Sequence, residues 1–282
     1  MTSKRFALPY LVGLAVLIGL PALGAIGLSL FEFSGVGPSR FVGFDNFTRM
    51  VGDDGFWRAL GNTLVYVAIS VPLRVTAAVG FGLLLYRRSR GIGLARASVY
   101  LPTVIPDVAF SLLWLWLLNP LYGPVPALIE SLGVEAPPFL VEPWGARIAV
   151  PVMAAFQIGE GFVIALAARR TISPVLYEAA AVDGASPWFT LSRITLPLMA
   201  PVAGLLALRD LVLAFQVNFV PAMILTDGGP RYATTYLSLY AYQQGFTYFR
   251  LGYAATLSLT MFLLTALVVA VQYRMARRWR LL

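Results

Sequence analysis

The sequence predicts an all-α membrane protein with six transmembrane helices and both termini in the cytoplasm. Of its 282 residues, 59% are hydrophobic and only 12% are charged, with a mean hydropathy of +0.78. A soluble domain carries about 25% charged residues. Apolar stretches of about 20 residues, the length needed to cross a bilayer, recur along the chain. The basic residues gather in alternate connections between these stretches.

The first apolar stretch follows Lys4 and Arg5. The alternative is a cleaved signal peptide, but the stretch exceeds the roughly 7–15 apolar residues of such a peptide. The second stretch is interrupted by Pro72 and Arg74. No segment is long or polar enough for a separate soluble domain, so we expect one membrane domain over residues 1–282. The expected spans are residues 6–31, 60–86, 99–118, 146–168, 201–225 and 251–273.

The third span carries Pro102 and Pro106 near its start. The loop after it is proline-rich and acidic, and we expect a short interfacial helix over residues 121–132. The loop after the fifth span is polar and aromatic and begins with Thr226-Asp-Gly-Gly-Pro230. Glycine and proline are the residues that interrupt helices in such connections.

The distribution of basic residues sets the predicted orientation. Odd-numbered loops hold only Arg40, Arg49, Arg58, Arg231 and Arg250. The positive-inside rule therefore places both termini and the even-numbered loops in the cytoplasm. The net charge of +8 is then a topological signal, and we expect membrane lipid but no nucleic acid as a partner. The even-numbered connections and the termini hold Lys4, Arg5, Arg87, Arg88, Arg90, Arg96, Arg169, Arg170, Arg193, Arg274, Arg277, Arg278 and Arg280.

The loop at residues 172–200 is predicted to form a helix, a glycine turn and a second helix. Ser173-Pro174 is an N-cap followed by proline at the first helical position. Good helix formers follow up to Val182, and Gly184 can adopt the left-handed conformation that ends a helix. Ser186-Pro187 repeats the start signal, and the second helix is expected to run to Pro197.

The composition excludes several functions. Cysteine and histidine are absent, so disulfides and histidine- or cysteine-dependent metal or nucleophilic sites are excluded. Lys4 is the only lysine, so the chain has no Walker A phosphate loop. If ATP drives this protein, another chain must bind it.

The same loop closely resembles the EAA loop of ABC-transporter permease subunits. The pattern of that loop is E-A-A-x-x-D-G-A, followed by an aromatic-rich segment and an I-x-L-P-x-x-x-P ending. The matching residues here are Glu178, Ala179, Ala180, Asp183, Gly184, Ala185, Ile194, Leu196, Pro197 and Pro201. The alternative is an ordinary amphipathic loop between membrane helices.

The resemblance extends to carbohydrate-uptake permeases of the maltose/glycerol-phosphate type, and more to their first subunit than to their second. Gly123-Pro-Val-Pro126 departs from the pattern, because relatives often have an asparagine shortly after that glycine. The matching segments are Phe41–Phe47, Phe56-Trp57, Asn62-Thr63, Leu101-Pro102, Trp114, Asn119-Pro120, Tyr122-Gly123, Thr226–Pro230, Thr234-Thr235 and Gly252–Ala255.

This resemblance implies a type I ABC importer in a bacterial or archaeal plasma membrane. Its other parts would be a second, homologous permease, two ATPase subunits that hold ATP and Mg²⁺, and an external solute-binding protein. This chain itself would bind no cofactor and catalyse no reaction. The residues implied in coupling to the ATPase are Glu178, Ala179, Ala180, Asp183, Gly184 and Ala185. For Glu178 or Asp183 alone, the alternative is a solvated surface carboxylate.

Polar residues within the spans are candidates for a substrate pathway. A charge at membrane depth costs about 2.5–3.5 kcal/mol on insertion scales and usually faces protein or water. Amides, arginine–carboxylate contacts and aromatic faces suit sugar hydroxyls. The alternative is that these charges only pair across helices or lie near an interface. The candidates are Arg74, Asp107, Gln157, Glu160, Arg209, Asp210, Gln216, Asn218 and the aromatic Trp114.

Two other classes of function are alternatives to an ATP-driven sugar permease. An ion-coupled secondary transporter would use Asp107, Glu160 and Asp210, but the sequence shows none of the repeats common in such folds. An intramembrane enzyme would need a catalytic constellation that no spacing indicates. The expected substrate is a mono- or disaccharide, with a polyol or glycerol-phosphate-like compound as the alternative.

Overall fold

The computed structural model describes the backbone of residues 3–87 and 89–278 and the side chains of residues 8–87 and 89–274. Among the basic residues used to predict the orientation, Arg88 and Arg280 lie outside the described residues. The same holds for the side chains of Lys4, Arg5, Arg277 and Arg278.

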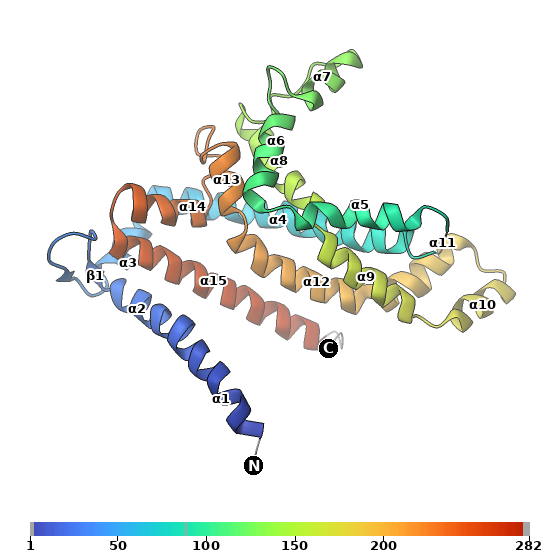
Figure 1. The fold of residues 1–282 in the computed structure, drawn as a ribbon, viewed down its shortest axis with the longest axis horizontal. Helices are drawn as coiled ribbons and strands as arrows, with labels where there is room; N and C mark the ends of the chain where they lie inside the picture. Colours follow the sequence, from blue (N-terminus) through green and yellow to red (C-terminus); the bar gives the residue numbers. More distant parts are fainter. Residues whose placement is uncertain (1–2, 88, 279–282) are drawn as a thin grey trace. The chain divides into compact units, whose positions relative to one another are not determined.

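The chain forms two compact units (Figure 1). Unit 1 consists of the residues up to Leu60 together with Leu237–Ala266, and unit 2 consists of Gly61–Tyr236 together with the residues from Leu267 onward. Two long helices, α4 (Asp54–Leu84) and α15 (Leu251–Arg278), contribute to both units. The prediction of one membrane domain concerns the chain as a whole and stays a prediction.

Unit 1 is built from the first membrane helix, a small hairpin and the segment before α15. The two strands of the hairpin pair antiparallel, with Phe31 opposite Phe41 and Glu32 opposite Arg40. The other elements of unit 1 are α1 (Ser3–Leu14), the π-helical turn η1 (Ala15–Gly19), α2 (Leu20–Leu28), β1 (Phe31–Glu32), β2 (Arg40–Phe41), α3 (Asp45–Val51), α14 (Leu237–Tyr242) and the π-helical turn η3 (Gln243–Thr247).

The core of unit 1 brings together α3, the start of α4, α14 and α15. Its buried residues include Phe56, Leu237 and Leu257. Beside it, the Tyr240 and Tyr253 hydroxyls donate hydrogen bonds to Asp53 Oδ2 at 2.5 and 2.6 Å. Burial alone would raise the pKa of the Asp53 carboxyl, but these bonds and backbone N–H donors hold the pKa below its ordinary value.

Unit 2 holds the remaining helices, of which several are short and joined by bends. Its core packs Ala78 of α4 against Ala165, Met199 and Leu206. A Cβ on Gly82 would lie 3.0 Å from that of Ala165, so small residues let α4 and α9 approach closely, as is common between membrane helices. The elements are α5 (Ile92–Val104), α6 (Asp107–Leu117), α7 (Pro124–Ser131), α8 (Pro143–Phe156), α9 (Gly159–Thr171), α10 (Pro174–Val182), α11 (Pro187–Thr190), the π-helical turn η2 (Leu191–Thr195), α12 (Leu196–Gln216) and α13 (Phe219–Leu225).

Within the described residues, four helices are long and apolar enough to cross a membrane, and the number is six if each of two bent pairs is one span. The α5–α6 pair bends by 105° and the α8–α9 pair by 52°. The expected third and fourth spans are therefore bent helix pairs. The short helix expected near residues 121–132 is confirmed as α7. The four single helices are Leu8–Leu28, Asp54–Leu84, Pro187–Gln216 and Leu251–Arg274.

The two bends have different causes. Ile105 precedes Pro106 and adopts extended dihedral angles (φ −74°, ψ 128°), because a residue before proline is disfavoured in the α conformation. The second bend follows Phe156 and has no proline in it. There, Gln157 leaves the helix (φ −93°, ψ 53°), and side chains from other helices bind the freed backbone groups.

The sequence prediction of the fifth span was wrong at both ends. We expected a helix to stop at Pro197 and a span to run over residues 201–225, but helical structure continues from Pro187 to Gln216. Pro197 lies in the first turn of α12, directly after the π-helical turn η2. Proline has no N–H to donate to the helix. The i→i+5 hydrogen bonds of η2 fit this missing donor, and the helix continues through Pro197. Residues beyond Gln216 form the separate helix α13.

Candidate functional site

The two bends of the broken helices are joined by polar contacts in unit 2. The Gly159 N–H at the start of α9 donates to Thr103 Oγ1 of α5 at 2.8 Å. Gln157 Nε2 donates to Asp107 Oδ1 at 3.3 Å. Any Cβ on Gly159 would collide with the Thr103 side chain, so glycine is needed for this approach. Both bends are therefore fixed against each other.

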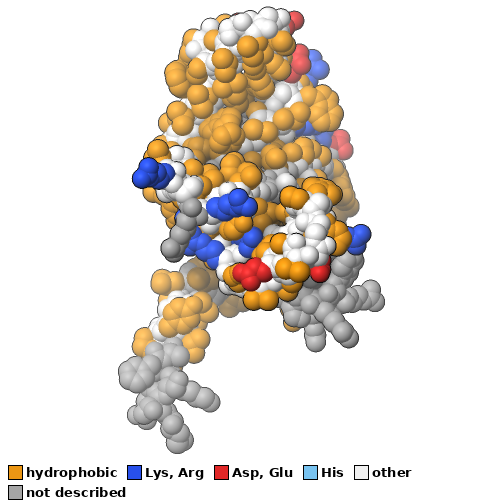
Figure 2. All heavy atoms as spheres, turned by 90° about the vertical axis from the view of Figure 1, so that its right-hand side faces the viewer, with side chains coloured by type: hydrophobic (Ala, Val, Ile, Leu, Met, Phe, Trp, Pro, Cys, Tyr) orange, Lys and Arg blue, Asp and Glu red, His pale blue; other side chains and the backbone are white. Residues whose placement is uncertain are grey.

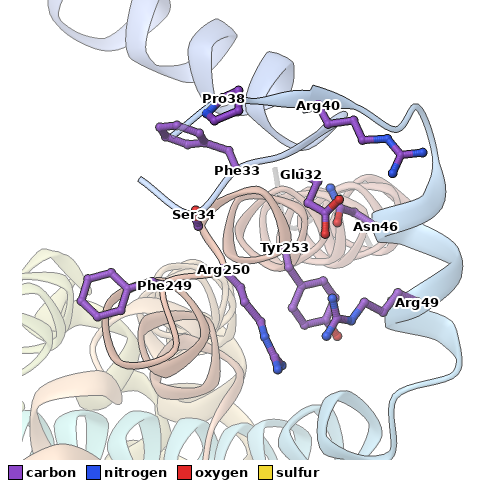
Figure 3. Close-up of a pocket in the computed structure, with 10 residues that line it drawn as sticks. All are labelled: Glu32, Phe33, Ser34, Pro38, Arg40, Asn46, Arg49, Phe249, Arg250 and Tyr253. Atoms are coloured by element: carbon purple, nitrogen blue, oxygen red, sulfur yellow. The ribbon is translucent and has the colours of Figure 1, made fainter. Parts of the chain in front are cut away.

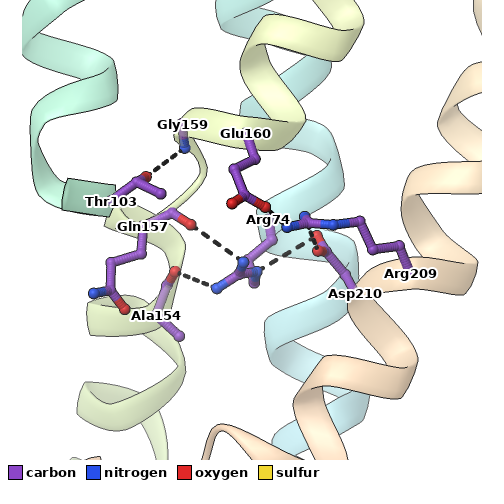
Figure 4. A network of polar contacts seen from close by, with 8 residues as sticks. All are labelled: Arg74, Thr103, Ala154, Gln157, Gly159, Glu160, Arg209 and Asp210. Atoms are coloured by element: carbon purple, nitrogen blue, oxygen red, sulfur yellow. Dashed lines mark hydrogen bonds and ion pairs between the residues drawn. The ribbon is translucent and has the colours of Figure 1, made fainter. Parts of the chain in front are cut away.

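Arg74 of α4 covers the exposed end of α8 (Figure 4). Its Nη1 donates to the Ala154 carbonyl at 2.9 Å and its Nη2 to the Gln157 carbonyl at 3.2 Å. The last carbonyls of a helix have no intrahelical partner, and in a bilayer such groups must be satisfied within the protein. The Arg74 guanidinium supplies a donor to the Gln157 carbonyl and a second donor to the Ala154 carbonyl, which also accepts from the Gln157 N–H at 3.1 Å.

Arg74 begins a chain of four alternating charges that contains two arginines and two carboxylates. Its Nε lies 3.4 Å from Asp210 Oδ2, and Asp210 Oδ1 accepts from Arg209 Nη1 at 3.1 Å. Arg209 also pairs with Glu160. The Asp210 side chain is 5% exposed and that of Glu160 is 57% exposed. This network is neutral, and it runs from a buried end to an open one.

Three further residues were predicted to line the pathway, namely Trp114, Gln216 and Asn218. Trp114 packs edge-on against Phe156, with ring centroids 5.0 Å apart. Gln216 is exposed at the end of α12, and Asn218 is fully buried in the short link to α13. Of the remaining candidates, Gln157 is joined to the network because its carbonyl accepts from Arg74, and Asp107 is joined to it through the Gln157 side chain.

The predicted helix–glycine–helix loop is confirmed as α10, a turn and α11. Gly184 has φ +72°. The Ala185 N–H bonds the Ala180 carbonyl at 2.9 Å, and the Gly184 N–H bonds the Ala181 carbonyl at 3.1 Å. This is the paired bonding of a Schellman motif. The Ser186 hydroxyl then accepts from the Phe189 N–H at 3.2 Å and caps α11.

A hollow of about 550 Å³ lies between α10 and the α11–η2 segment. Glu178 does not line it, and its carboxylate is exposed elsewhere on α10. Five of the six residues predicted to couple to an ATPase line this hollow: Ala179, Ala180, Asp183, Gly184 and Ala185.

The surface around the hollow is apolar and exposed, which sequence reasoning missed. Val182 is 87% exposed and Trp188 is 72% exposed. Figure 2 faces the end of unit 2 that carries α10 and α11, where hydrophobic side chains lie exposed beside a few charged ones. A contiguous exposed apolar surface indicates a site of protein–protein or membrane interaction. Trp188 was the residue in the sequence that could have indicated this exposed apolar surface.

Sequence reasoning also missed a cation–π stack beneath the loop. The Arg169 guanidinium at the end of α9 lies 4.0 Å from the Tyr86 ring centroid and 4.4 Å from that of Tyr177 on α10. Arg169 is only 8% exposed. The Tyr177 hydroxyl is 3.0 Å from Thr195 Oγ1 of η2. This stack ties the loop to α9, to the segment that follows α4 and to the helix that continues into α12.

A sequence profile for the "Binding-protein-dependent transport system inner membrane component" family matches residues 54–281. The chain is also similar to individual members of known transport systems. The trehalose/maltose transport system permease protein MalF of Thermococcus litoralis is 33% identical over 250 residues, which cover 87% of this chain and 82% of the relative. The sulfoquinovosyl glycerol transport system permease protein SmoG of Agrobacterium fabrum is 31% identical over 272 residues, which cover 95% and 88%.

The fold agrees with the sequence match. A chain of the crystal structure of the bacterial alginate ABC transporter, in complex with an alginate pentasaccharide-bound periplasmic protein, has a TM-score of 0.86 and 25% identity. The alignment covers 98% of this chain and 93% of that chain. These findings confirm the predicted resemblance and the type I importer fold, while the orientation of the termini stays a prediction. The chain therefore belongs to the inner membrane components of binding-protein-dependent transport systems, which are the permease subunits of ABC importers.

Proposed function

We propose that this chain forms half of the translocation pathway of an importer for a mono- or disaccharide and couples it to ATP hydrolysis by separate subunits. The observation that carries the proposal is the α10–α11 loop, with its hollow and its exposed apolar side chains. Sugars are favoured because the similar proteins are named for trehalose and maltose, for sulfoquinovosyl glycerol and for alginate. A polyol or glycerol-phosphate-like compound is the alternative.

In this proposal the loop lies in the cytoplasm and seats on an ATPase subunit that binds ATP and Mg²⁺. The small side chains of Ala179 and Ala180 permit close approach of the partner. The carboxylates of Glu178 and Asp183, both exposed, bind arginine or backbone donors of the partner. The second permease and an external solute-binding protein complete the assembly in the plasma membrane.

The charge network favours ATP-driven over ion-driven transport. Proton or sodium coupling needs a carboxylate that is free to take up and release the ion. Asp210 and Glu160 are each paired with an arginine, and Asp107 accepts a hydrogen bond from Gln157. The same network gives the pathway alternating donors and acceptors at its open end, near Glu160 and Arg209, where sugar hydroxyls can bind.

The proposed function predicts ATP-dependent sugar uptake. We expect the complete assembly in proteoliposomes to take up radiolabelled sugar when ATP is inside the vesicles and its cognate binding protein is outside. Uptake with a proton or sodium gradient but without ATP would contradict the proposal. Competition of the labelled sugar with polyols and glycerol phosphates, measured in the same vesicles, separates the two substrate classes.

Gly184→Val should uncouple the loop. Valine in the left-handed conformation costs about 1–2 kcal/mol, which shifts the equilibrium about five- to thirtyfold against the native turn, so we expect greatly reduced transport with normal membrane insertion. Gly133→Val is the matched control, because Gly133 also has positive φ (+79°), follows a short helix and has open space at its Cβ. Equal transport by the two variants at equal abundance would argue against the coupling role.

Arg169→Leu should weaken the transmission from the loop. It removes two cation–π contacts, each worth about 0.5–2 kcal/mol, and we expect less transport per ATP hydrolysed while the ATPase stays bound. The ratio of uptake to phosphate release measures this effect. The adjacent, exposed Arg170→Leu is the control. If both variants lower the ratio equally, the stack does not transmit the movement.

Arg74→Leu should destabilise the chain more than the double variant Arg74→Leu/Asp210→Leu. The single change leaves the buried Asp210 carboxylate with Arg209 as its one arginine partner, so we expect a cost below the about 3–5 kcal/mol of a buried pair broken completely, whereas an apolar pair is often tolerated. Thermal unfolding of the detergent-purified assembly measures the difference. A double variant no more stable than the single one would mean that the Arg74–Asp210 pair does not carry this stability.

A further inference from the structure

A second polar pocket is formed entirely by residues of unit 1. Its volume is about 440 Å³, within the usual range for small-ligand sites of about 300–1,000 Å³. The β1–β2 hairpin, α3 and the start of α15 form its walls (Figure 3). The charged residues that line it are Glu32, Arg40, Arg49 and Arg250.

The backbone around this pocket is fixed by buried hydrogen bonds. Asn46 Nδ2 donates to the carbonyls of Ser29 and Phe31 at 2.9 and 3.0 Å. The Gly252 N–H donates to the Phe33 carbonyl at 3.2 Å. A side chain on Gly252 would collide with the Phe31 carbonyl, so glycine allows the hairpin to lie directly on α15. The pocket is therefore preformed.

The pocket is positively charged, with three guanidinium groups and one carboxylate. In the part of the chain that the structure describes, none of its three arginines has a carboxylate oxygen within 4.0 Å. Arg49 lies over the Tyr253 ring at 5.3 Å, and Arg250 Nη1 donates to Gln244 Oε1 at 3.3 Å. The nearby Asp53 carboxylate accepts from Tyr240 and Tyr253 instead. The three positive charges thus remain available to an anion.

The position of the pocket indicates the source of that anion. Glu32 follows the end of the candidate span Leu8–Leu28, and Arg250 directly precedes the span Leu251–Arg274. Aromatic side chains beside the pocket, those of Phe41, Tyr248 and Phe249, are exposed. Aromatic residues gather where membrane helices leave the hydrocarbon, at the level of the lipid headgroups.

We propose that this pocket binds the phosphate of an anionic phospholipid, such as phosphatidylglycerol. Arginine forks hold phosphate oxygens in bidentate fashion, and the same attraction of basic side chains to anionic headgroups operates in basic pockets on the cytoplasmic side of membranes. The proposed orientation of the permease assigns the pocket to the outer leaflet, but the binding itself needs neither ATP nor sugar. The lipid would anchor the hairpin to the ends of α2 and α15.

The test is native mass spectrometry of the complete purified assembly, titrated with phosphatidylglycerol or phosphatidylcholine. We expect preferential binding of phosphatidylglycerol. Each of Arg40→Gln, Arg49→Gln and Arg250→Gln should weaken that binding about fivefold, and the triple variant about a hundredfold. Arg58→Gln is the matched control, because Arg58 is exposed in the same unit but does not line the pocket.

Three results would overturn the proposal. The first is equal phosphatidylglycerol binding by the wild type and the variants. The second is displacement of the lipid by an equal concentration of inorganic phosphate, which would indicate a site for a free anion. The third is a variant that keeps the lipid but loses affinity for the external binding protein, which would indicate a docking site for an acidic protein surface.

If the triple variant does not fold, the three single variants decide. Because no outcome depends on transport, failure of the transport function would leave this test intact.

Discussion

The structure of unit 2 depends on one constraint, which is that a helix broken inside a membrane must find partners for its free backbone groups. The break between α8 and α9 exposes carbonyls that Arg74 covers and an N–H that Thr103 accepts. A lone guanidinium in this setting is itself costly, so it needs Asp210. Asp210 is in turn shared with Arg209, which reaches Glu160. One break in the backbone thus accounts for the whole charge network.

The α10–α11 loop is subject to a different constraint, because it is exposed and yet fixed in its conformation. A loop of this length would ordinarily be mobile. Here the Schellman turn at Gly184 fixes the end of α10, and the Ser186 cap fixes the start of α11. The helix that begins at Pro187 then continues without interruption to Gln216. A force on the loop is therefore applied to the end of a long membrane helix rather than to a flexible link.

The sequence predicts the features that depend on local chemistry and misses those that depend on contacts between distant segments. Apolar length identifies membrane helices, and Gly184 identifies the turn. Proline was a poorer guide: Pro106 marks a real bend, whereas Pro197 lies in a helix that η2 keeps continuous. The bend after Phe156 has no proline to signal it. The Arg169 stack joins residues that are far apart in the chain, so no local pattern could show it.

The loop and the charge network are connected by the same two helices. Helix α9 carries Glu160 in its first turn and Arg169 in its last, which are about 14 Å apart along the axis at 1.5 Å per residue. The helix that contains Thr195 continues to Asp210, about 22 Å further along. Because Tyr177 contacts both Arg169 and Thr195, a displacement of α10 acts on both helices at once. Toward their other ends, α9 carries Glu160 and α12 carries Asp210, which are the two carboxylates of the network. A relative movement of α9 and α12 must therefore alter the contact between Glu160 and Arg209 at the exposed end of the network. The geometry thereby links the exposed surface of the α10–α11 loop to the polar groups of the charge network without any flexible segment between them.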